Sequence, residues 1–161
     1  MFSLLLPQRI DNTYRGYKLG LWLFAVVVLM KVAMSLNSVF NGYSVATSAD
    51  GIPLDTFPSG AARTVVALFA LLGLSHFIFA LLGVLALVRY RSMIPIMLTL
   101  LLLQQLSKKL ILQFVPIVRT GTPPGFYVNL VLLAAIIVGL ALSLRSQATG
   151  SATVVVPPGA T

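Results

Sequence analysis

Six polar side chains interrupt long apolar stretches of this sequence, and their chemistry is the first thing to explain. They are two ammonium groups, one imidazole and three amides: Lys31, His76, Gln104, Gln105, Lys108 and Asn129. An ammonium group binds anions, an imidazole takes up or releases a proton, and an amide both donates and accepts hydrogen bonds. Gathered in an apolar setting, these groups would bind an anionic ligand or the carboxylate of a partner.

Four apolar stretches carry these residues, and each is long enough to cross a hydrocarbon core about 30 Å thick. They run over 19–40, 62–88, 93–115 and 126–144. The sequence of 161 residues is 58% hydrophobic and 9% charged, whereas a soluble domain is about 45–50% apolar. Because backbone groups in lipid must bond to one another, the spans should be helical. The sequence predicts an all-α integral membrane protein, a four-transmembrane-helix bundle.

Three regions follow from this pattern. Residues 1–18 form an N-terminal segment, 19–145 the membrane domain, and 146–161 a small, polar tail that we expect to be disordered. Cleavage of the first span as a signal peptide is disfavoured, because its apolar run exceeds a usual h-region. Between the last two spans, Pro123 and Pro124 should stop any helix, and Gly125 should permit a turn.

The basic residues predict an orientation. Six lie on the side of the chain termini and four on the other side: Arg9, Arg15, Lys18, Arg89, Arg91 and Arg145 against Arg63, Lys108, Lys109 and Arg119. The positive-inside bias therefore favours an inner-membrane protein with both termini in the cytoplasm and the connection 41–60 outside. The net charge of +8 is scattered and forms no basic face, so no nucleic acid is expected as a partner.

The polar residues share a depth in the membrane. Measured from the cytoplasmic helix ends, Lys31, His76 and Gln105 lie ~18 Å deep, and Lys108 and Asn129 ~22 Å deep. The sequence therefore predicts a polar pocket in the outer half of the bundle.

Helical spacing also predicts which way His76 faces. Gly73, Ala80 and Gly83 share its stripe on the second span. Small residues mark places where transmembrane helices approach closely, so His76 should face the bundle.

Simpler interpretations of these residues stay open. Lys108 and Lys109 can extend their stems toward the outer headgroups, and we assign Lys109 to that role. The amides and a neutral His76 can serve as hydrogen bonds between helices. Lys31 lies too deep for its ammonium group to reach the headgroups. A central lysine costs about 2.5–3.5 kcal/mol on insertion scales.

Lys31 has no obvious ion partner in the spans. The chain has no glutamate, and its three aspartates, Asp11, Asp50 and Asp55, lie outside the apolar stretches. Lys31 is then neutral, or Asp50 or Asp55 reaches it from the loop. Otherwise an anionic ligand such as a lipid phosphate, or another subunit, supplies the negative charge.

The composition excludes several chemistries. One histidine and no cysteine cannot complete a zinc site or provide a thiolate nucleophile, so no metal and no cofactor is expected. A Ser-His-Asp triad would need an aspartate from the loop to reach His76 at mid-depth.

A short chain of four spans, with a longer connection after the first, resembles the DoxX-like integral membrane proteins of bacteria. The resemblance covers residues 15–145 and rests on this layout, with no diagnostic motif. It implies a four-helix membrane protein, and some members associate with respiratory or redox partners. No residue's role carries over.

Two functions are consistent with the sequence. The first is a non-enzymatic membrane protein, either an accessory subunit or a binder of an anionic or lipid-like ligand, alone or as a homo-oligomer. The alternative is an enzyme or carrier for a lipophilic substrate such as a quinone, with His76 moving protons and Lys31 stabilising charge. We favour the first, because one histidine and one lysine are little catalytic equipment.

Overall fold

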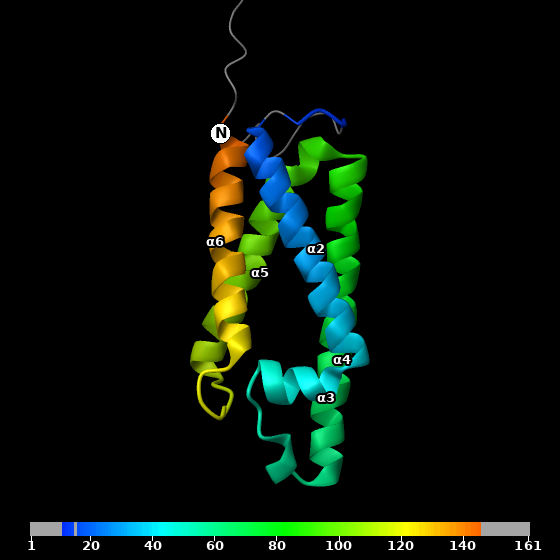
Figure 1. Cartoon of the computed structure of the whole chain (residues 1–161), viewed down its shortest axis with the longest axis vertical. Helices are drawn as coiled ribbons and strands as arrows, with labels where there is room; N and C mark the ends of the chain where they lie inside the picture. Colours follow the sequence, from blue (N-terminus) through cyan, green and yellow to red (C-terminus); the bar gives the residue numbers. More distant parts are fainter. Residues whose placement is uncertain (1–10, 15, 146–161) are drawn as a thin grey trace, which may run out of the picture.

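Four long helices form the frame of the structure, a computed structural model that describes residues 11–14 and 16–145 (Figure 1). They are α2 (Lys18–Phe40), α4 (Ser59–Val88), α5 (Ile94–Phe114) and α6 (Pro124–Leu144). All four are long and apolar enough to cross a membrane, and the described residues contain no strand. The predicted fold class, an all-α bundle of four transmembrane helices, is confirmed, and the chain is a multi-pass membrane protein. The tail predicted for 146–161 and the first ten residues lie outside the described residues.

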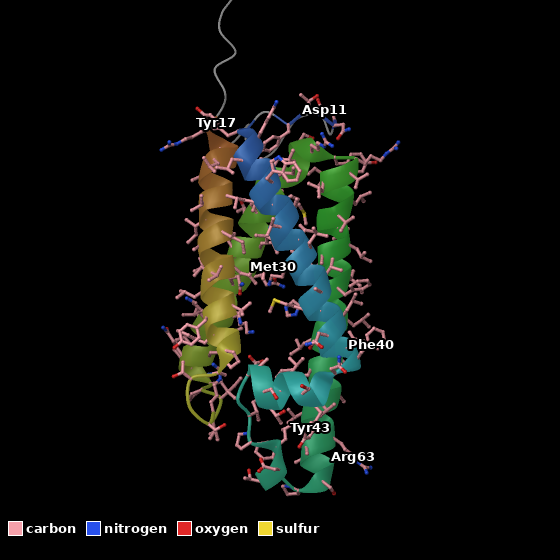
Figure 2. All side chains as sticks on the ribbon, in the orientation of Figure 1. Asp11, Tyr17, Met30, Phe40, Tyr43 and Arg63 are labelled. Carbon is pink, nitrogen blue, oxygen red and sulfur yellow. The ribbon has the colours of Figure 1, made fainter. Side chains whose placement is uncertain are left out.

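Successive helices run in opposite directions, so the bundle has two ends. At the basic end, where α2 and α5 begin, stand Lys18, Arg89, Arg91 and Arg145. At the loop end are the connections 41–58 and 115–123. Figure 2 labels Tyr17 at the basic end and Arg63 at the loop end.

Helix α2 crosses the bundle diagonally. It begins beside α6 and ends against α4 (Figure 1). The close approach to α4 depends on glycine: a Cβ on Gly73 would stand 2.9 Å from the Ser38 Cβ and 3.0 Å from the Ser35 carbonyl oxygen. A Cβ on Gly83 would stand 2.9 Å from Val28. The prediction that this small-residue stripe faces the bundle is therefore confirmed.

The main core lies in the half of the bundle toward the basic end. Fully buried side chains from α2, α5 and α6 meet there, including Phe24, Ile94, Leu98, Leu132 and Ile136. A second, smaller core lies at the loop end. It joins Ala46, Ile52 and Leu54 to the first turns of α4.

Short helices build the cap at the loop end. They are α3 (Gly42–Ser44), the π-helix η1 (Val45–Ala49) and the 3₁₀ helix η2 (Leu54–Thr56). A second 3₁₀ helix, η3 (Arg91–Met93), precedes α5 at the other end. Helix α4 has 30 residues, about 45 Å at 1.5 Å per residue, which is longer than a hydrocarbon core. Its first turns therefore extend past the other helices, and the cap packs against them.

The prediction that Pro123 and Pro124 stop any helix and that Gly125 permits a turn was wrong. Pro124 is the first residue of α6 and Pro123 precedes it, the positions where proline's fixed φ favours a helix start. Gly125 lies in the first helical turn, where a Cβ would stand 2.5 Å from the Ala49 carbonyl oxygen. It permits the cap to approach α6, while Gly121, with φ of 72°, makes the turn.

Candidate functional site

A cavity of about 350 Å³ lies between α5 and α6 at the loop end. Two helical faces and two connections line it: Gln105, Lys108, Lys109, Leu112 and Gln113 from α5; Phe126, Asn129, Leu130 and Leu133 from α6; and Asp50 and Arg119 from the connections.

Helical periodicity explains how the chain builds these walls. On each helix the lining positions recur at i, i+3, i+4 and i+7, which places them on one face. The α5 face carries mostly polar groups and the α6 face mostly apolar ones. The cavity therefore has a polar wall opposite an apolar wall.

Two hydrogen-bond donors in this lining have no partner among the described residues. Gln105 is 6% exposed, and its Nε2 is buried without a hydrogen bond. The Arg119 Nε is buried in the same way. A buried donor left unpaired costs about 1–3 kcal/mol, so such groups in a native protein call for a ligand or water. The exposed Lys108 and Lys109 add two more cationic donors.

Asp50 is the carboxylate of the lining, and the loop fixes its position. Its own amide donates to the Val45 carbonyl oxygen over 3.0 Å. The carbonyl oxygen of Gly51 accepts from the Thr120 amide over 2.9 Å and from the Thr120 hydroxyl over 3.1 Å. Among the described residues, no hydrogen bond joins the Asp50 carboxylate to Lys108, Lys109 or Arg119. The pocket thus presents both signs of charge without their neutralising each other directly.

Asn129 bonds within its own helix. Its Nδ2 donates to the Gly125 carbonyl oxygen over 2.8 Å, so this bond does not join two helices. Neither buried atom of the neighbouring amides does so either: the Gln104 Oε1 and the Gln105 Nε2 lack partners among the described residues. The interpretation of these three amides as interhelical hydrogen bonds finds no support in these atoms.

The structure brings together three of the six residues singled out in the sequence. Gln105, Lys108 and Asn129 line the cavity, whereas Lys31, His76 and Gln104 do not. Lys31 and His76 nevertheless lie near enough to Lys108 for the charges to interact. Both residues belong to the helix pair α2 and α4, which diverges from α5 and α6 toward the loop end (Figure 1).

Sequence reasoning missed Asp50, Lys109, Arg119 and Gln113 as lining residues. Lys109 and Gln113 continue the helical face of Gln105, a signal that the sequence contained. The contribution of Asp50 and Arg119 depends on how two connections fold together, which no local pattern reveals.

No group of three His, Cys, Asp or Glu side chains suited to a metal ion occurs in 11–14 and 16–145.

No protein-family model, curated protein or solved structure matches this chain. The resemblance to DoxX-like proteins accordingly stays a hypothesis.

Proposed function

We propose that this multi-pass membrane protein is a non-enzymatic binder of a lipid-like molecule with a phosphate or carboxylate group, whose headgroup occupies the pocket between α5 and α6. The observation that carries the proposal is the pair of buried, unpartnered donors at Gln105 and Arg119 in one cavity. Lys108 and Lys109 beside them bring this set of donors to four. Phosphate or carboxylate oxygens are the acceptors that such a set binds most strongly.

The other wall supports an amphiphilic ligand. Leu112, Leu130, Leu133 and Phe126 offer apolar surface, and the Phe126 and Leu130 side chains are each 48% exposed. Ligand pockets span roughly 300–1,000 Å³, and at about 350 Å³ this one suits a headgroup. Acyl chains would then lie along the apolar face of α6.

The enzyme or quinone-carrier alternative gains no observation in its favour. His76 and Lys31, its two active residues, lie outside the lining. A quinone is also uncharged, whereas the lining carries three cations and one carboxylate. Binding without catalysis, alone or as an accessory subunit, uses the groups that are present.

We further propose that the protein lies in an inner membrane with its basic end in the cytoplasm, which puts the pocket in the outer leaflet. Since the sequence has no cysteine, single cysteines at Asn12 and Ser48 can be probed in intact cells with an impermeant thiol reagent. We expect labelling of Ser48→Cys but not of Asn12→Cys. The reverse pattern would invert the orientation without affecting the pocket.

The ligand proposal is tested by binding of a phospholipid to the purified full chain, measured by native mass spectrometry. Lys108→Gln should weaken binding about tenfold, because a charge-assisted hydrogen bond contributes about 1.5–3 kcal/mol. Arg63→Gln removes an exposed cation at the same end of the bundle that does not line the cavity. It should bind as the parent does. Equal binding by parent and Lys108→Gln would refute the proposal.

A further inference from the structure

We infer that the pocket selects a phospholipid whose headgroup carries a primary ammonium group as well as a phosphate, with Asp50 binding the ammonium. The chemical class is an aminophospholipid of the phosphatidylethanolamine type. This inference rests on the proposed function and names the ligand of that same site.

The starting observation is a carboxylate in a pocket otherwise built for anions. The Asp50 carboxylate would repel the phosphate of a purely anionic ligand, because both groups are negatively charged. The fold nonetheless fixes this residue, since its own amide is bonded to η1 and the carbonyl oxygen of the next residue, Gly51, accepts from Thr120. The Asp50 Oδ1 also lies 3.4 Å from the place where a Cβ on Gly125 would stand. The carboxylate is therefore held at the start of α6.

The carboxylate and the two lysines of the lining lie at different depths in the pocket. Asp50 stands beside the first turn of α6, at the loop end. Lys108 and Lys109 precede the last residue of α5, Phe114, by six and five positions. At 1.5 Å per residue, this places them ~8–9 Å inward from the loop end of that helix. Gln105, with its unpartnered Nε2, lies deeper still. From the loop end inward the order is Asp50, with Arg119 in the neighbouring connection, then the two lysines, then a neutral donor.

This order matches a zwitterionic lipid standing in the leaflet at the loop end. Its ammonium lies toward water and can donate to Asp50, and its phosphate lies below it and accepts from the lysines and Arg119. The ester oxygens and the first part of the acyl chains then meet Gln105 and the apolar face of α6. A glycerol headgroup satisfies the cations but leaves Asp50 with no cation, and a choline headgroup has no N–H to donate to it.

The test compares three phospholipids with identical acyl chains, which carry ethanolamine, glycerol or choline headgroups. Each is titrated into the full-length parent, Asp50→Asn and Asp55→Asn, and bound lipid is measured by native mass spectrometry. Asp50→Asn keeps the shape of the side chain, and no hydrogen bond to the Asp50 carboxylate occurs among the described residues. Asp55, exposed and outside the lining, is the matched control.

We expect the parent to bind the ethanolamine lipid about tenfold more tightly than the other two. Asp50→Asn should lose that preference while binding the glycerol lipid at least as well, and Asp55→Asn should behave as the parent. A parent without preference, or an Asp50→Asn variant that keeps it, would overturn the inference.

Two further outcomes are also decisive. If Asp50→Asn strengthens binding of all three lipids equally, Asp50 only repels anions and the inference is wrong. If soluble phosphoethanolamine displaces the lipid at equal concentration, the ligand is a water-soluble zwitterion and the lipid assignment is wrong. Failure of the proposed function itself is distinct, because Lys108→Gln would then leave the binding of every headgroup unchanged.

Discussion

The two halves of helix α5 use the same face for opposite purposes. In the half toward the basic end, this face carries Ile94, Leu98 and Leu101, which are at most 4% exposed and belong to the main core. The stripe continues at helical spacing through Gln105 and Lys108, where it lines the cavity. The polar site thus occupies positions that would be core in a bundle closed along its whole length. Packing in one half keeps α5 and α6 together, and polar residues in the other half leave room for a ligand.

The largest expected effect compares the buried and the exposed face of α5, with one substitution on each. Leu98→Ala should lower the free energy of unfolding by about 2–5 kcal/mol, because it opens a cavity in a core where Leu98 is 0% exposed. Leu106→Ala, at a side chain that is 49% exposed, should cost less than half as much. Unfolding of the detergent-solubilised protein measures both. Equal losses would mean that the exposed face of α5 is packed as tightly as its buried face.

Lys31→Leu tests whether the polar region beyond the cavity belongs to the site. On insertion scales the change removes a cost of about 2.5–3.5 kcal/mol, so membrane insertion of α2 in a glycosylation reporter should improve. Lipid binding should fall less than in Lys108→Gln, because Lys31 does not line the cavity. A loss as large as that of Lys108→Gln would extend the site across both helix pairs.

Local pattern predicted the helices well and the site only in part. Span limits agreed with the helices to within three residues, because continuous apolar runs in lipid leave the backbone few alternatives to a helix. Depth along each helix correctly brought Gln105, Lys108 and Asn129 together. It also included Lys31 and His76, since depth does not reveal that α2 diverges from α5. Asp50 and Arg119 come from connections whose positions depend on tertiary contacts such as the bonds between Thr120 and Gly51.

Adjacent glutamines offer a matched pair for separating stability from binding. Gln104 and Gln105 each have a buried amide atom without a partner among the described residues, but only Gln105 lines the cavity. Replacing either by leucine should stabilise the protein by about 1–3 kcal/mol, because an unsatisfied polar group is removed. Only Gln105→Leu should weaken phospholipid binding. Equal weakening by Gln104→Leu would show that the binding site is not the one lined by Gln105.

The smallest effect is expected at the basic end, at two buried hydroxyls. The Tyr14 and Ser143 hydroxyl oxygens are buried and have no hydrogen-bond partner among the described residues. A Cβ on Gly20 would stand 2.7 Å from the Tyr14 oxygen, so that oxygen is tightly enclosed. Tyr14→Phe should therefore change the free energy of unfolding at neutral pH by less than about 1 kcal/mol, toward greater stability. Lipid binding at the opposite end should be unchanged.

Alkaline pH gives this last prediction a sharper form. Burial raises the pKa of the Tyr14 phenol above its ordinary 10.0, and the nearby Ser143 side chain offsets part of that rise. The folded state therefore holds the phenolic proton more tightly than the unfolded state does. The stability that this contributes is fully present below pH 10.0 and is lost as the pH rises through the raised pKa.

The parent should lose stability over this range faster than Tyr14→Phe. Tyr17→Phe, at a side chain that is 41% exposed, should follow the parent. Parallel losses in all three proteins, measured by thermal unfolding from pH 8 to about pH 11, would show that the Tyr14 phenol is as well solvated in the folded protein as in the unfolded chain.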